Sequence, residues 1–152
     1  MKEIGKILVC VDLSKYSEET VEYSKTFAKK FGAQIVLLNV INQRDIDTLK
    51  AANYYYPDKI NLDSYLERVR TDRQKKMEDV DSLQPAEGME GARILVRVGV
   101  PFEEILKTIE EEQVDLVVMG KKGKSNFPTT LFGSTAEKLF KYAKIPIVSV
   151  RS

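Results

Sequence analysis

The sequence predicts an α/β protein of three layers, with helices on both faces of a five-stranded parallel sheet. Short, continuous apolar runs alternate with helical patterns along the chain, and such runs are typical of strands that are buried on both faces. This alternation implies right-handed crossovers, which place helices on both faces of the sheet. With 152 residues, the chain is expected to form one domain over residues 1–152.

Apolar runs define the predicted strands, and turn residues end several of them. Asp12 follows the first strand, Gly99 the third and Gly120 the fourth. Pro146, near the start of the last strand, favours an edge position because proline cannot donate to a strand ladder. The predicted strands are 7–11, 35–41, 94–98, 115–119 and 145–150.

Apolar residues at helical spacing occupy most of the segments between these strands. The first helix is predicted to begin after an N-cap at Ser14 or Ser17 and to stop at Gly32. Pro101 suits the first position of a later helix. The remaining helices are predicted over 61–83, where 67–81 form a solvated charged face, and over 133–143.

The segment 42–60 shows no clear period and is predicted to be a long connection. It contains the run Tyr54-Tyr55-Tyr56-Pro57. These aromatic side chains could form a partner surface or a lid over a ligand, because exposed aromatic residues favour interfaces. They could equally pack on the sheet, and we favour packing, because aromatic residues more often serve local packing.

Composition narrows the classes of function. A net charge of +1 gives no overall field that would select nucleic acid or an anionic membrane. No apolar stretch reaches about 18 residues, so no membrane span is expected, and the N-terminus resembles a strand rather than a signal peptide. The only cysteine, Cys10, fits a reducing compartment and a small buried apolar role, so we expect a cytoplasmic protein.

The sequence contains no histidine and one cysteine. This composition excludes Ser-His-Asp and Cys-His catalysis, histidine-bound zinc and thiolate metal cages. Any bound metal is therefore expected to be a hard ion held mostly by phosphate oxygens and carboxylates.

The segment 119–138 carries the strongest functional signal. Glycines follow a predicted strand, and Gly133-Ser134-Thr135 opens a helix. Glycines let the backbone approach an anion, and backbone amides in a nest or at a helix start attract phosphate. The hydroxyl groups of Ser134 and Thr135 can donate hydrogen bonds to phosphate oxygens, and the lysines add positive charge. The residues concerned are Gly120, Lys121, Lys122, Gly123, Lys124, Gly133, Ser134 and Thr135.

Better-known phosphate motifs do not account for this segment. Gly123-Lys124-Ser125 resembles the end of a P-loop, but Val118 stands where the first glycine of that motif belongs. No Gly-x-Gly-x-x-Gly fingerprint follows any predicted strand.

Asp12, Val40 and Gly120 all fall at carboxyl ends of predicted strands, where ligands bind in open α/β sheets. Structural explanations remain open for each of these features. The glycines could serve turns alone, and Asp12 or Ser134 could merely cap a helix. The side chain of Val40 belongs to a buried strand whether or not this residue contacts a ligand.

The pattern Gly120-x2-Gly123-x9-Gly133-Ser134, with Val11-Asp12-Leu13-Ser14, resembles the universal stress protein family, specifically its ATP-binding branch. Similar segments are 99–101, 114–120, 133–138 and 145–150, so the resemblance covers nearly the full length apart from roughly 42–90. The resemblance implies a Rossmann-like sheet of the adenine nucleotide alpha hydrolase-like type. It also implies ATP, ADP or AMP across the sheet edge, with Mg²⁺ or Mn²⁺ held through the phosphates.

By resemblance, Asp12 and its neighbours would border adenine and ribose, and the backbone of Val40 would read the base. The glycines would shape the phosphate loop, and the hydroxyls after Gly133 would bind phosphate oxygens. Lys121 stands where the family often has serine or threonine. The implied nucleotide-binding residues are Cys10, Val11, Asp12, Val40, Met119, Gly120, Lys121, Gly123, Lys124, Gly133, Ser134 and Thr135.

These observations favour a nucleotide-responsive regulatory module in stress response, in which bound triphosphate orders residues 124–132. A slow ATPase or self-phosphorylating protein is one alternative, although no carboxylate lies in the phosphate loop and efficient catalysis is not expected. A nucleotide-independent dimeric interaction protein is another. The resemblance implies a homodimer through the last strand, and an apolar edge strand supports pairing. A further protein partner is left open.

Overall fold

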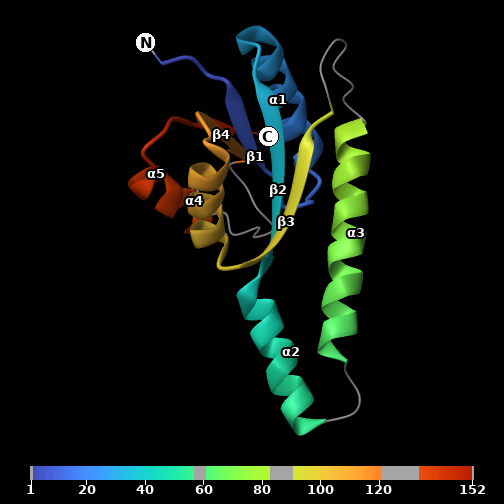
Figure 1. Ribbon diagram of the computed structural model, residues 1–152. Coiled ribbons are helices and arrows are strands. Elements are labelled where there is room, and N and C mark those ends of the chain that lie inside the picture. The colour runs from blue at the N-terminus through green and yellow to red at the C-terminus, as the bar shows by residue number, and fades with distance from the viewer. Residues whose placement is uncertain (1, 57–60, 83–90, 121–133, 152) are drawn as a thin grey trace.

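The computed structural model describes residues 2–56, 61–82, 91–120 and 134–151, and confirms the predicted three-layer α/β/α architecture (Figure 1). Its five-stranded parallel sheet has the order β3-β2-β1-β4-β5. The chain order reverses beside β1, whose neighbours are β2 and β4. The strands are β1 (Lys6–Cys10), β2 (Gln34–Asn42), β3 (Arg93–Gly99), β4 (Leu116–Gly120) and β5 (Ile147–Val150).

Helices cover both faces of this sheet. In Figure 1, α4 and α5 lie to the left of the strands, while α1 and α3 lie on the other side. The contacts agree, because α1 and α3 contribute to one apolar cluster and α4 and α5 to the other. The helices are α1 (Ser17–Phe31), α2 (Gln43–Tyr55), α3 (Leu62–Ser82), α4 (Pro101–Glu112) and α5 (Ser134–Tyr142).

The alternation of side chains along β1 divides the core between these layers. Ile7 and Val9 pack in the cluster that contains Met77 of α3, whereas Leu8 packs in the cluster that contains Leu139 of α5. All of these side chains are fully buried. Each large aliphatic side chain buried in this way contributes about 1.5–3 kcal/mol relative to its exposed state.

Several predicted helix and strand boundaries are confirmed. Gly32 ends α1 with φ 67°, in the left-handed region that glycine adopts without strain. Pro101 begins α4, and β5 lies at an edge of the sheet as Pro146 indicated. The predicted N-cap of α1 is wrong, because the capping position is Tyr16. Ser14 lies two residues earlier, where its hydroxyl accepts a hydrogen bond from the Tyr16 amide.

The predicted long connection over 42–60 is also wrong, because most of it is the helix α2. Asn42 caps this helix, and its side-chain oxygen accepts from the Arg44 amide at 3.0 Å. Ile46 is the one buried residue of α2, so the sequence carries no apolar stripe that would reveal the helix. In Figure 1, α2 continues from the carboxyl end of β2 and projects away from the sheet.

The tyrosine run does not pack on the sheet as we had expected. Tyr54, Tyr55 and Tyr56 are 82%, 77% and 64% exposed at the far end of α2. Tyr54 and Tyr55 pack edge-on against each other, with ring centroids 5.5 Å apart. The packing prediction fails because α2 carries these residues beyond the reach of the sheet.

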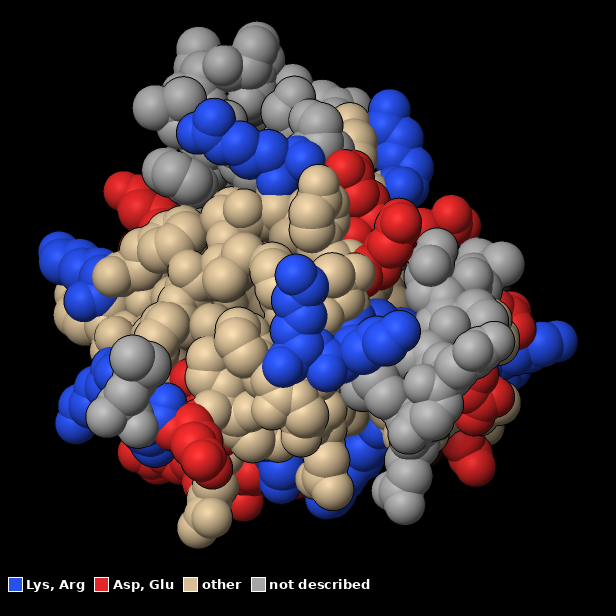
Figure 2. Space-filling model, turned by 90° about the horizontal axis from the view of Figure 1, so that it is seen from above, with Lys and Arg blue, Asp and Glu red and all other residues tan. Residues whose placement is uncertain are grey.

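The surface seen from the amino ends of the strands carries charges of both signs. In Figure 2, lysines and arginines are dispersed among acidic and uncharged residues instead of forming a single field, in keeping with the net charge of +1. No helix among residues 2–56, 61–82, 91–120 and 134–151 has the length and apolarity needed to cross a membrane.

Candidate functional site at the carboxyl edge of the sheet

The carboxyl ends of β1, β2 and β4 meet at the edge where the chain order reverses. Cys10 pairs with Leu38 of β2 on one side and with Met119 of β4 on the other. The Val11 amide adds one further bond, to the Leu38 carbonyl at 2.9 Å. The residues that follow these pairs, including Asp12, Val40 and Gly120, therefore lie along one edge. This is the position where parallel sheets of this kind bind ligands.

Asp12 organises the turn between β1 and α1. Its Oδ1 accepts from the Ser14 amide at 2.9 Å and from the Ser17 hydroxyl at 3.2 Å. Ser17 is buried at the start of α1, so this carboxylate ties the strand end to the helix. Among the described residues, both contacts fall on Oδ1 and none on Oδ2. Asp12 thus has a structural role and retains one oxygen for a ligand.

The next residue holds an unusual backbone conformation. Leu13 has φ 62°, in the left-handed region that costs a residue with a β-carbon roughly 1–2 kcal/mol. Its side chain packs against the cluster that includes Val9 and Val11, and this packing offsets part of the strain. Strained backbone of this kind concentrates at sites that need a fixed loop shape.

Cys10 is a partly buried thiol that packs against the α4–α5 cluster. Desolvation by burial raises the pKa of Cys10 to about 12. The neutral thiol is therefore maintained near neutral pH, so Cys10 lacks the thiolate needed for nucleophilic attack or metal binding. Its packing against this apolar cluster agrees with the predicted apolar role, although the side chain is partly rather than fully buried.

The other strand-end residues divide between core and edge. The Met119 side chain is buried and packs with Ala136 and Leu139 of α5, so it holds that helix against the sheet. Val40 is half-buried beside the same cluster. Gly120, the last residue of β4, is partly exposed. Backbone groups of Val40 and Gly120 are accordingly better placed for a ligand than the Met119 side chain is.

The start of α5 completes the described part of this edge. Because α5 connects the carboxyl end of β4 to the amino end of β5, its first turn lies on the carboxyl side of the sheet. Ser134 is exposed and Thr135 partly exposed in that turn. The first amides of a helix lack internal partners and attract anions. The other predicted residues, Lys121, Gly123, Lys124 and Gly133, lie outside the described residues.

Sequence reasoning missed a polar connection beneath this edge. Asn39 is only 2% exposed, and its Nδ2 donates to the Val11 carbonyl at 2.7 Å. Its Oδ1 accepts from Nη1 of Arg73 at 2.8 Å, and the same nitrogen lies 3.5 Å from the Val40 carbonyl oxygen. The available signals were an asparagine within an apolar strand and an arginine within an apolar helix stripe. That stripe is Leu66, Val69, Met77 and Val80.

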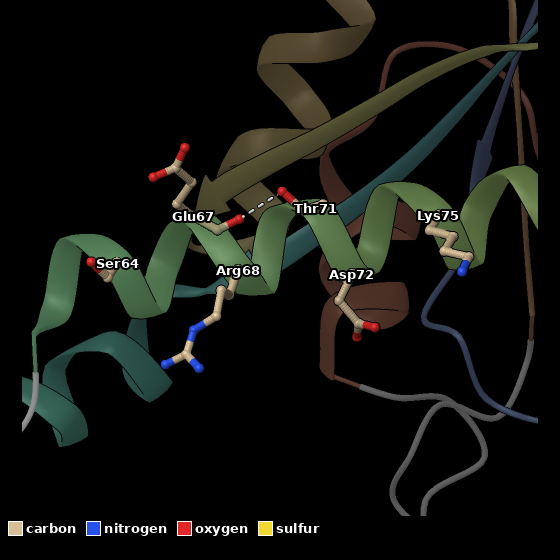
Figure 3. A pocket seen from close by; sticks show the side chains of 6 residues that line it. All are labelled: Ser64, Glu67, Arg68, Thr71, Asp72 and Lys75. Atoms are coloured by element: carbon tan, nitrogen blue, oxygen red, sulfur yellow. Dashed lines mark hydrogen bonds between the residues drawn. The ribbon is translucent and has the colours of Figure 1, made fainter.

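The outer face of α3 carries a separate open hollow of about 710 Å³ (Figure 3). One helix supplies its whole lining, and the only hydrogen bond drawn there runs from the Thr71 hydroxyl to the Glu67 carbonyl at 3.0 Å. Acidic and basic groups alternate along it, as expected for a solvated helix face. The lining residues are Ser64, Glu67, Arg68, Thr71, Asp72 and Lys75. Within the described ranges, no cluster of acidic or cysteine side chains could hold a metal ion.

Comparison with known proteins extends this description. The sequence profile of the universal stress protein family matches residues 3–151. Universal stress protein MJ0577 of Methanocaldococcus jannaschii is 31% identical, over 96% of this chain and 94% of its own length. A solved structure of the hypothetical protein MJ0577 superposes with a TM-score of 0.82 at 27% identity, covering 99% of this chain and 98% of that one.

A more distant structure shares the fold and contains a nucleotide. The universal stress protein of Archaeoglobus fulgidus in complex with dAMP has a TM-score of 0.59 at 16% identity, covering 97% of this chain and 98% of that chain. The family match spans nearly the full length, and the sheet has the expected strand arrangement. The chain therefore belongs to the universal stress protein family.

Proposed function

We propose that this chain is an ATP-binding regulatory module of the stress response, with the nucleotide at the carboxyl edge of the sheet. The observation that carries the proposal is the meeting of three strand ends and the start of α5 at one edge. ADP and AMP share the adenine and ribose groups and are ligands of the same proposed site. The relative from Archaeoglobus fulgidus with bound dAMP supports an adenine nucleotide in this family.

The described residues fit such a ligand. Asp12 retains one carboxylate oxygen, which suits a ribose hydroxyl donor, and its Oδ1 contacts keep the side chain in place. Val40 offers backbone groups to the base, while Ser134 and Thr135 offer hydroxyls and helix-start amides to phosphate. Met119, Cys10 and Val11 support the edge from the core side.

The proposed phosphate loop extends this set to Gly120, Lys121, Gly123, Lys124 and Gly133. Mg²⁺ or Mn²⁺ would be held mainly through the phosphate oxygens, because hard cations prefer oxygen ligands. The metal would supply charge neutralisation, and the lysines would add to it. Binding to the folded state alone raises stability by about 2.7 kcal/mol at a hundredfold excess of ligand over Kd, which gives the module a measurable response to nucleotide.

A homodimer through β5 belongs to the same proposal. This strand lies at the sheet edge and pairs with β4 on one side, from Ile147 opposite Val117 to Val150 opposite Gly120. An apolar edge strand with an unpaired side favours pairing with a second copy. A cytoplasmic location is also proposed, because a reducing compartment suits a chain whose one cysteine cannot pair internally.

Isothermal titration of nucleotide-free protein with Mg-ATP tests the binding proposal. We expect saturable heat and a rise in melting temperature that grows with ATP concentration. Asp12→Asn should weaken binding, because it removes the carboxylate charge but keeps an oxygen for the Ser14 amide. Asp47→Asn, an equal change of charge on the exposed surface of α2, is the matched control. Absence of both heat and a melting shift at millimolar ATP would reject the proposal.

A further inference from the structure

Three adjacent tyrosines form an exposed aromatic surface at the end of α2. We call Tyr54, Tyr55 and Tyr56 the tyrosine tip, and each of these side chains is mostly exposed. Because α2 has 13 residues, it extends about 20 Å, and the tip lies at its far end, away from the sheet (Figure 1). Single apolar residues are common on protein surfaces, but contiguous exposed patches mark interaction sites. The tip is therefore a candidate interaction surface.

The inward side of α2 does not use these rings. Its buried and half-buried residues include Ile46, Leu49 and Asn53, which recur at helical spacing. Tyr55 follows Ile46 by nine residues, about two and a half turns, and so lies on the opposite side of the helix. Tyr54 and Tyr55 pack edge-on against each other. This contact restrains both rings before a partner arrives, which lowers the entropy cost of binding.

The charge pattern of the tip narrows the kind of partner. Residues 51–56 contain no acidic or basic side chain. A surface that binds an anionic membrane combines aromatic residues with lysines or arginines, which this stretch lacks. A neutral surface can meet an identical surface without repulsion between like charges. The absence of charge in this stretch therefore favours a second copy of the chain over a membrane or a nucleic acid.

Tyrosine is also complementary to another tyrosine. The face of its ring is partly negative and the edge partly positive, so two rings pack edge to face. Its hydroxyl both donates and accepts hydrogen bonds. A two-fold interface presents the same patch on both subunits, so it requires a surface that complements itself. The three exposed rings of the tip meet this requirement.

We propose that the tyrosine tip is a self-association surface, through which two copies of the chain meet about a two-fold axis. The exposed surface of the three side chains is roughly 450 Å² in each copy. A pair of tips therefore buries about 900 Å², which is the size of a weak, reversible interface. The contact is accordingly expected at high micromolar protein concentration.

The tip and the proposed β5 contact lie on different parts of the molecule. α2 follows β2 along the chain, and β1 and β4 separate β2 from β5 in the sheet. Both contacts can therefore form at once, and together they link dimers into larger assemblies. The tip contact uses no residue of the proposed nucleotide site, so it goes beyond the proposed function.

Sedimentation of the Ser149→Pro chain tests the inference, because the proline removes a backbone donor from β5 and so isolates the tip contact. We expect this chain to dimerise at high micromolar concentration. Adding Tyr55→Ser should raise the dimer Kd at least tenfold, since it removes one ring from each side of a two-fold interface. Tyr23→Ser is the matched control, because Tyr23 is an exposed tyrosine of α1 that also lies beside another ring, that of Phe27. The control should leave the Kd unchanged.

Each outcome decides the question. A Ser149→Pro chain that stays monomeric overturns the inference and leaves the tip to a different kind of partner. Equal Kd values with and without Tyr55→Ser also overturn it, because the association then uses another surface. Melting curves show whether Ser149→Pro folds. If it does not, the tyrosine variants are compared in the wild-type chain, where loss of species larger than a dimer in Tyr55→Ser alone supports the inference and equal masses contradict it.

Discussion

Single residues at the carboxyl edge stabilise the local structure, and several of them also belong to the proposed nucleotide site. Asp12 uses Oδ1 to hold the turn into α1, and the residue after it, Leu13, adopts a positive φ. Asn39 joins β1 to α3 although its partner Arg73 lies 34 residues away in the chain. The sequence indicated Asp12 through its place after a strand. It did not indicate the Asn39–Arg73 contact, because pairing between distant polar residues leaves no local period.

The strain at Leu13 predicts an unusual order of stability among variants. Leu13→Ala and Leu13→Gly both lose the packing of the side chain, but glycine alone relieves the positive φ. We expect Leu13→Gly to be more stable than Leu13→Ala by about 1 kcal/mol, measured by urea unfolding. Glycine is ordinarily the less stable of the two. Lys15→Gly and Lys15→Ala, two residues further on at an exposed position without a positive φ, provide the control and should show the ordinary order.

The raised pKa of Cys10 predicts a loss of stability in alkali. Burial favours the neutral thiol and raises the Cys10 pKa from 9.0 to about 12. Above the unfolded pKa, the unfolded chain releases this proton while the folded chain retains it, so stability falls as pH rises from 9 towards 12. Urea unfolding at pH 8 and pH 10.5 should show this loss, and Cys10→Ala should show less of it. An identical pH dependence in both proteins would contradict the account.

At the scale of elements, the strands and most helices were predictable because burial gives them regular patterns. β1 and β4 are apolar runs, β2 is apolar apart from Asn39 and its two end residues, and α3 carries an apolar stripe that includes buried Met77. α2 was not predictable, because only Ile46 is buried along it and the remaining side chains follow no period. The exposed tyrosines were misassigned for the same reason. A segment that projects from the core carries little periodic signal.

The edge strand β5 predicts how the proposed dimer can be disrupted. The Pro146 carbonyl accepts from the Val117 amide of β4, so the backbone groups of Ser149, three residues on, face the outer side. Ser149→Pro removes one outward N–H donor and leaves the apolar residues of β5 unchanged. Sedimentation should show the wild type as a dimer. Ser149→Pro should dimerise more weakly, with a dimer Kd raised at least tenfold.

The control for this experiment is Ser149→Ala, which keeps the backbone donor. It should dimerise like the wild type, since the proposed contact runs through the main chain. A monomeric wild type at high micromolar concentration, or equal dimerisation of the proline variant, would count against the strand-pairing account. Melting curves of each variant separate lost pairing from lost folding.

At the scale of the whole molecule, the topology brings residues from distant parts of the chain to one edge. The order β3-β2-β1-β4-β5 puts the ends of β1, β2 and β4 next to one another. This convergence was predictable, because parallel strands separated by helices can join only through crossovers. The direction of each side chain at the edge was not, since it depends on packing from both helical layers.

The most direct test of the proposed site is an amide NMR titration of the nucleotide-free protein with Mg-ATP. The account predicts that the largest shifts fall on Asp12, Leu13, Val40, Gly120 and Ser134, with saturation at a single Kd. The outer face of α3, at Arg68 and Asp72, should remain unchanged. Shifts concentrated on that face, or no saturable shifts at the carboxyl edge, would contradict the claim that this edge binds the nucleotide.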